Sequence, residues 1–100
     1  MNITISHIDD TLTVRLEGAL DYTTSAQMET LITDINAIRA PKVVFELGRV
    51  SHVDSVGLGM LHLAKDEIVT MGETLVLRGA TGTVRRLFEI TDSAADFVIE

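Results

Sequence analysis

The sequence predicts a single α/β domain with a mixed β-sheet, spanning residues 1–100. First, short segments rich in Val, Ile and Leu alternate with longer segments whose apolar residues recur at helical spacing, a pattern that produces parallel strand pairs with right-handed crossovers. Second, the first eighteen residues alternate apolar and polar side chains, which is typical of paired strands. Third, 46% of the residues are hydrophobic and 23% are charged, which indicates an ordinary globular domain.

The N-terminal segment is predicted to form a β-hairpin with one buried face. Its apolar residues occupy alternate positions, and Asp9 and Asp10 between the two runs have the chemistry of a turn. Gly18 is expected to end the second strand. The apolar residues of the predicted buried face are Ile3, Ile5, Leu12, Val14 and Leu16.

The first helix is predicted to begin at Thr24 and to end by residue 40. Thr24 and Gln27 have the spacing of a capping box, in which the two side chains satisfy free backbone donors at the helix start. Pro41 cannot continue the helix. The apolar stripe consists of Met28, Leu31, Ile32, Ile35 and Ile38.

Strands and helices alternate in the rest of the chain. Residues 42–47 contain the continuous apolar run Val43-Val44-Phe45, which predicts a strand covered on both faces. A helix is predicted from about Ser55 to Met71, with Gly72 at its C-terminal cap. A strand at 75–77, a short helix capped by Thr83 and a strand at 97–99 complete the order β-β-α-β-α-β-α-β.

Charge and composition exclude several classes of function. The formal net charge is −7 and the eight Lys and Arg residues are scattered, so the sequence lacks the basic footprint of a nucleic-acid or anionic-lipid binder. The absence of cysteine rules out disulfides and thiolate metal ligands. Apolar runs are short and the first residues lack a signal-peptide pattern, so we expect no membrane insertion and a cytoplasmic location.

The segment Asp54-Ser55-Val56-Gly57-Leu58-Gly59 has features that packing alone does not explain. It lies where a predicted strand gives way to the second helix, and open α/β sheets usually place function at the carboxyl ends of their strands. Each glycine inside a helix costs about 1 kcal/mol relative to alanine. The presence of two glycines in the first turns of this helix therefore needs a structural or functional explanation.

Helical geometry supplies that reason. At about 100° per residue, Gly57 falls on the core face and lets the helix approach the sheet, whereas Gly59 lies on the opposite face with Ser55. Leu58 lies on the flank and is expected to be at least partly exposed. An accessible hydroxyl with a clear approach and an apolar neighbour indicates a docking surface. The core face comprises Gly57, Leu61, Ala64, Ile68 and Met71, and the opposite face comprises Ser55, Gly59, His62 and Asp66.

A phosphate on Ser55 would turn this surface into a switch. It would add roughly −1.5 to −2 charges, which the free N–H groups and the dipole of a helix N-terminus favour, so we expect the domain to stay folded. A partner packed on Leu58 and Gly59 would instead meet a bulky dianion beside Asp54. We therefore predict that Ser55 is a phosphoacceptor.

These residues carry a resemblance to a known family. Residues 54–59 are similar to the Asp-Ser-(Ser/Thr)-Gly-Leu-Gly motif of the STAS domain family, the bacterial anti-sigma-factor antagonists. Gly18-Ala19-Leu20-Asp21 resembles the Gly-x-Leu-Asp segment that ends the second strand of that family. The element order also matches, so the resemblance spans essentially the whole chain. One departure is Val56, which stands where a second hydroxyl residue is usual.

The resemblance implies a non-enzymatic protein-binding switch. The unmodified protein would bind an ATP-dependent serine kinase that is also an anti-sigma factor, and so release the sigma factor. Phosphorylation of Ser55 would separate the pair, and a PP2C-type phosphatase would restore binding. The free protein is expected to be a monomer without cofactor or metal. The predicted partner-binding residues are Asp21, Asp54, Ser55, Val56, Gly57, Leu58, Gly59 and His62.

Two other interpretations are compatible with the same residues. Ser55 also suits a helix N-cap, and the domain would then be a constitutive scaffold or an accessory subunit of a larger assembly such as a lipid transporter. The second interpretation is a serine hydrolase that uses His52, Asp54 and Ser55. It is opposed by Val53, which occupies the position where a nucleophile elbow has glycine.

Overall fold

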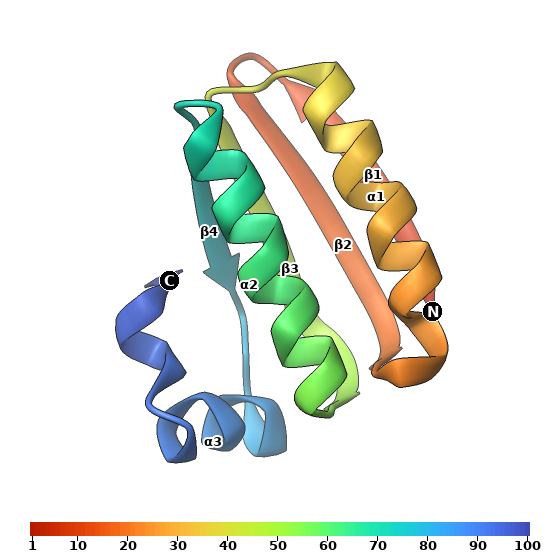
Figure 1. Ribbon diagram of the computed structural model, residues 1–100, viewed down its shortest axis with the longest axis vertical. Helices are drawn as coiled ribbons and strands as arrows, with labels where there is room; N and C mark the ends of the chain where they lie inside the picture. Colours follow the sequence, from red (N-terminus) through yellow and green to blue (C-terminus); the bar gives the residue numbers. More distant parts are fainter.

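The computed structural model describes the backbone of residues 1–100 and every side chain except that of Ala94. Its elements follow the predicted order, with two short 3-10 helices added (Figure 1). The strands are β1 (Asn2–Ile8), β2 (Thr11–Leu20), β3 (Lys42–Val53), β4 (Thr74–Arg78) and β5 (Val98–Ile99). The α-helices are α1 (Ser25–Ile38), α2 (Ser55–Thr70) and α3 (Gly82–Ile90), and the 3-10 helices are η1 (Tyr22–Thr24) and η2 (Ser93–Asp96).

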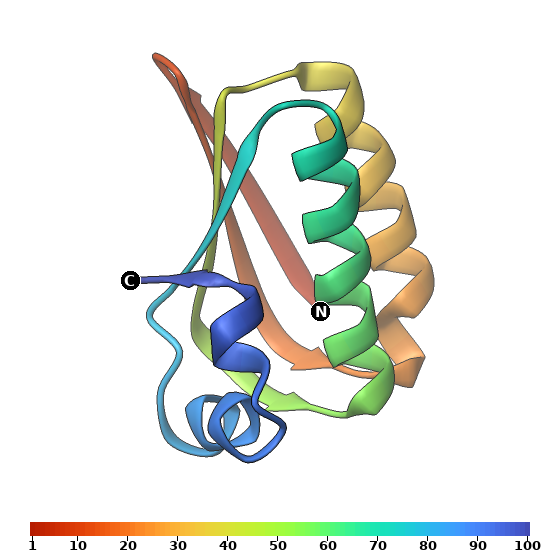
Figure 2. The same ribbon diagram turned by 60° about the vertical axis from the view of Figure 1, so that its left-hand side comes forward.

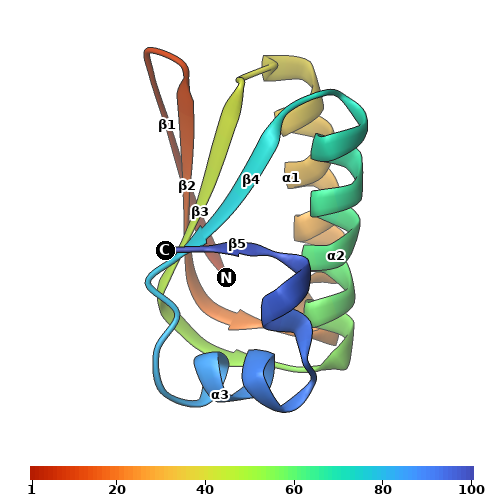
Figure 3. The same ribbon diagram turned by 90° about the vertical axis from the view of Figure 1, so that its left-hand side faces the viewer.

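The five strands form one mixed sheet in the order β1-β2-β3-β4-β5. β1 is antiparallel to β2, and the three following pairs are parallel. Successive crossovers step the same way across the sheet, so α1 and α2 lie side by side on one face (Figure 3). The shorter α3 lies at the end of the sheet where β4 leads out (Figure 2). The described helices are all too short or too polar to cross a membrane.

The core lies between the sheet and the α1–α2 layer. Side chains of a strand alternate between its faces, so every second residue of β2 and β3 points toward the helices. The edge strand contributes less than predicted, because Ile3 is only half-buried and Ile5 is 40% exposed. Core residues include Leu12, Val14, Leu16, Met28, Leu31, Ile35, Val43, Phe45, Leu47, Leu61, Ala64, Ile68, Leu75 and Leu77.

Helices cover only one face of the sheet, in contrast to the two-sided cover predicted for residues 42–47 (Figure 3). Val44 is nevertheless fully buried on the helix-free face. Ion pairs share that face: the Arg78 guanidinium lies 3.1 Å from Glu46 Oε1 and 2.8 Å from Glu100 Oε1, and Lys42 Nζ lies 3.6 Å from Glu100 Oε2. This charged layer ties the two-residue β5 to β4 and β3.

β2 and β3 both run further than predicted. β2 passes through Gly18, which has a φ of 108°, and β3 continues beyond Leu47 to Val53. Register shifts interrupt the β2–β3 pairing near Gly18, and such bulges break the strict alternation by which strands are recognised. The extension places Leu20 opposite Val53 at the carboxyl ends of the two strands.

The capping box predicted for α1 and the cap predicted for α3 are both wrong, although Thr24 does occupy the N-cap position of α1. The capping box near α1 joins Asp21 to Thr24 around η1, and Gln27 instead donates a hydrogen bond to the backbone oxygen of Met1. α3 begins one residue before Thr83, at Gly82, and its N-cap residue is Thr81, whose carbonyl oxygen accepts a hydrogen bond from the Arg85 amide. At α1, the short turn η1 directly precedes the helix and lies outside the apolar periodicity.

Candidate interaction site

The predicted site residues gather where β2 and β3 end. Leu20 and Val53 are paired in adjacent parallel strands, so the residues that follow them leave the sheet at the same edge. Asp21 leads into η1 and Asp54 leads into α2, and both turns lie together at one end of the molecule (Figure 1). The two segments that matched the family motif are thereby brought side by side.

Asp54 fastens these two turns to each other. It is the N-cap of α2: its Oδ1 accepts a hydrogen bond of 2.8 Å from the Gly57 amide. Its Oδ2 accepts a hydrogen bond of 3.1 Å from the Tyr22 amide. The bond from Gly57 is the main cause that lowers the pKa of Asp54 below its ordinary value, with a smaller contribution from Tyr22. Asp54 is therefore a charged clamp between η1 and α2.

Ser55 is the first residue of α2 rather than its cap. The interpretation of Ser55 as the N-cap is wrong, since Asp54 occupies that position. The Ser55 side chain is exposed, and its hydroxyl makes no hydrogen bond to any group in the described part of the chain. Removing this hydroxyl would therefore cost the fold little, and its accessibility suits modification.

The two glycines of the segment differ as helical geometry predicts. A Cβ atom on Gly57 would lie 2.0 Å from the carbonyl oxygen of Leu20, so only glycine allows α2 to pack against the end of β2. A Cβ atom on Gly59 would meet nothing within 4 Å, and this residue is exposed. Leu58 is half-buried against the core, as expected for a flank residue, while Val56 is 42% exposed.

Asp21 organises the turn opposite Ser55. Its Oδ1 accepts a hydrogen bond of 2.9 Å from the Thr23 amide, and Thr24 Oγ1 accepts one of 3.1 Å from the Asp21 amide. These bonds fix the turn, and Tyr22 within it is 70% exposed. Sequence reasoning missed Tyr22; its position directly after the Gly-x-Leu-Asp segment was the available signal.

The chain also matches a known protein family. The STAS domain family matches residues 2–100, which is nearly the whole chain. The chain belongs to the STAS domain family.

Several relatives of this STAS domain are known by sequence or structure. An anti-sigma-B factor antagonist of Staphylococcus epidermidis is 31% identical over 88 residues, covering 88% of this chain and 81% of that protein. An anti-sigma factor antagonist from Mycobacterium paratuberculosis has the same fold, with a TM-score of 0.82, 24% identity, and 98% and 83% of the two chains covered. The Bacillus cell fate determinant SpoIIAA in its phosphorylated form gives a TM-score of 0.74 at 19% identity, covering 99% and 91%.

His62 is the predicted site residue that lies farthest along α2 from Ser55. It lies seven residues beyond Ser55, about two helical turns along α2. Its ring packs against Phe97 with 4.7 Å between the ring centroids, and the side chain is half-buried. Much of its surface is therefore occupied by the C-terminal segment.

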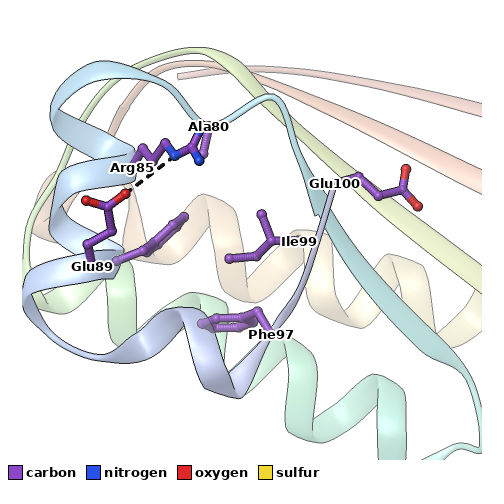
Figure 4. A pocket seen from close by; sticks show the side chains of 7 residues that line it. Ala80, Arg85, Glu89, Phe97, Ile99 and Glu100 are labelled. Atoms are coloured by element: carbon purple, nitrogen blue, oxygen red, sulfur yellow. Dashed lines mark ion pairs between the residues drawn. The ribbon is translucent and has the colours of Figure 1, made fainter.

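One hollow of the STAS domain lies between α3 and β5, and its lining residues include none of the predicted site residues (Figure 4). It has a volume of about 490 Å³, and Phe88, Phe97 and Ile99 form its apolar lining. Arg85 and Glu89 at its rim are paired at 3.5 Å. Ser55, Val56 and Gly59 are instead exposed at the start of α2, where they are accessible to another protein.

Proposed function

We propose that this STAS domain is an anti-sigma factor antagonist whose binding is switched by phosphorylation of Ser55. The observation that carries the proposal is the exposed Ser55 hydroxyl, free of hydrogen bonds to described groups, at the first position of a helix already capped by Asp54. The antagonist relatives, and the phosphorylated form in which SpoIIAA exists, support the same role.

The fold accommodates a phosphate at this position. The N-terminal N–H groups and the dipole of α2 stabilise negative charge near Ser55. Asp54 already occupies the Gly57 and Tyr22 amides, so the phosphate would project outward instead of replacing the cap. The modified domain would then stay folded and carry a cluster of negative charge where Ser55, Asp54 and Asp21 meet.

A bound partner would not accommodate a phosphate on Ser55. Tyr22 and Val56 expose apolar surface near Ser55, and aromatic side chains on rigid turns are frequent energetic centres of interfaces. A partner that packs on these residues and on the open surface of Gly59 must exclude water from the Ser55 side chain. Burying a phosphate there without a matching cation would be strongly unfavourable.

The partners in this proposal follow from the same switch. The unphosphorylated form binds an anti-sigma factor that is also a serine kinase, and a PP2C-type phosphatase removes the phosphate. The domain works in the cytoplasm and catalyses no reaction itself. The alternative of a constitutive scaffold gave Ser55 a capping role, and the capping carboxylate of Asp54 removes the need for that role.

The test compares Ser55→Ala and Ser55→Asp as baits, with Ser51→Asp as a control that adds the same charge at another exposed serine. Ser55→Ala should retain the partner and take up no phosphate from it with ATP, as read by mass spectrometry. Ser55→Asp should bind at least about tenfold more weakly, a difference of about 1.4 kcal/mol, while Ser51→Asp should bind normally. Phosphate on a residue other than Ser55, or equal binding by all three variants, would refute the switch.

A further inference from the structure

The two edges of the sheet differ in a way that the proposed function does not use. β5 closes one edge with only two residues, and Glu100 beside it is held by Arg78. β1 closes the other edge with seven residues, Asn-Ile-Thr-Ile-Ser-His-Ile, paired to β2 in a continuous register without a bulge. Only the second edge presents a long row of backbone N–H and C=O groups.

Monomeric proteins usually protect such an edge. Lysine, proline, bulges, very short strands or a covering element prevent edge-to-edge pairing. β1 contains no acidic residue, lysine, arginine or proline. It is the terminal strand of the sheet, and no described element pairs with its outer side. Ile5 is 40% exposed and Ile8 is 69% exposed along it.

The shape of the hairpin leaves this edge accessible. The turn between β1 and β2 projects away from the helical layer, so neither helix covers the Ile8 end (Figure 3). Near the other end a hollow of about 340 Å³ lies between the strand and α1, lined by Ile3 of β1 and by Gln27, Thr30, Leu31 and Asp34 of α1. A neighbouring strand paired to β1 would lie along this open edge.

We propose that β1 pairs antiparallel with β1 of a second copy of this chain, forming one continuous sheet across a two-fold axis. A pair centred on Ile5 sets Ile5 against Ile5, and Thr4 against Ser6. It also sets Ile3 against His7, and Asn2 against Ile8. These opposed pairs bring no two charged side chains together, and they bury the exposed Ile5 against its mate.

The charge distribution favours this edge over other contacts between copies. Each copy carries a formal charge of −7, and the outer surfaces of α1 and α2 expose Glu29, Asp66 and Glu67. Two copies meeting through the helices would therefore repel each other. The uncharged β1 edge avoids that repulsion, and it replaces the monomer expected from the sequence with a concentration-dependent dimer.

Sedimentation equilibrium of the intact chain over a wide concentration range tests the proposal. Wild type should show a monomer–dimer equilibrium. Ile5→Lys and Ile5→Glu each oppose two like charges at the axis, so each alone should associate at least about tenfold more weakly, equivalent to about 1.4 kcal/mol. Ile90→Lys is the matched control, since Ile90 is an exposed isoleucine on α3, and it should dimerise like wild type.

Mixing the Ile5→Lys and Ile5→Glu variants provides the decisive measurement. The introduced ammonium of one copy would face the introduced carboxylate of the other only in a pair centred on Ile5, so the mixture should recover association that neither variant has alone. Thermal unfolding of each variant checks that the fold is intact. A wild type that stays monomeric at every concentration, or a mixture no stronger than the separate variants, would overturn the proposal, as would an Ile90→Lys variant that also fails to dimerise.

Discussion

Gly57 and Gly59 lie two positions apart in α2, and the structure gives these two glycines different roles. Gly57 faces the end of β2, where its missing side chain leaves room for the Leu20 carbonyl. Gly59 faces open space and has no internal reason to lack a side chain. Packing therefore accounts for the first glycine, and an approaching partner accounts for the second under the proposed function.

Alanine substitutions should separate these two roles. Gly57→Ala places a methyl group 2.0 Å from a backbone oxygen, so α2 must shift, and we expect a loss of about 3 kcal/mol in unfolding free energy. Gly59→Ala should stabilise the free domain by about 0.5–1 kcal/mol through helix propensity. Urea unfolding monitored by circular dichroism measures both. Equal effects of the two substitutions would contradict the assigned packing of α2.

At the scale of elements, the sequence predicted the order of strands and helices and the core face of α2, because both depend on apolar periodicity. It did not predict the full length of β3, since Arg49, Ser51 and His52 conceal a strand whose pairing contains register shifts. The sequence left open whether Asp54 or Ser55 caps α2. Tyr22 was missed because the hydrogen bond that places its exposed side chain beside α2 joins its backbone amide to Asp54, thirty-two positions away.

The clamp that Asp54 forms between η1 and α2 should be visible as a pH dependence of stability. The pKa of Asp54 is lowered in the folded state, chiefly by the Gly57 amide. Its contribution is therefore fully present above the ordinary aspartate pKa and is lost as the pH falls through the lowered value. Asp54→Asn keeps a good capping side chain without the charge, so it should be less stable than wild type near neutral pH.

The difference between wild type and Asp54→Asn should then shrink as the pH falls. Urea titrations at a series of pH values measure this difference directly. Asp54→Ala, which removes the capping oxygen as well, should remain less stable than Asp54→Asn at every pH. A difference between wild type and Asp54→Asn that stays constant into the acid range would mean that the ionised carboxylate is not what fastens the two turns.

At the scale of the whole molecule, the charges are not arranged to support the helices. The chain has fifteen acidic residues and eight basic residues. None of the three α-helices has an acidic residue in its first turn or a basic residue in its last turn. The first turn of α2 is free of acidic side chains beyond its cap, which leaves its dipole available for a phosphate on Ser55. The negative C-terminal end of the α2 dipole likewise has no basic side chain in the last turn to compensate it.

Thr70→Lys should therefore stabilise the domain. Thr70 is exposed and is the last residue of α2, where a cation interacts favourably with the helix dipole by about 0.3–1 kcal/mol at low ionic strength and also reduces the net negative charge. Thr70→Gln is the control for side-chain length and helix propensity. The excess stability of the lysine variant over the glutamine variant, measured by urea unfolding, should decline as salt screens it. An excess that is absent at low salt, or unchanged at high salt, would show that uncompensated charge is not what limits the stability of this acidic molecule.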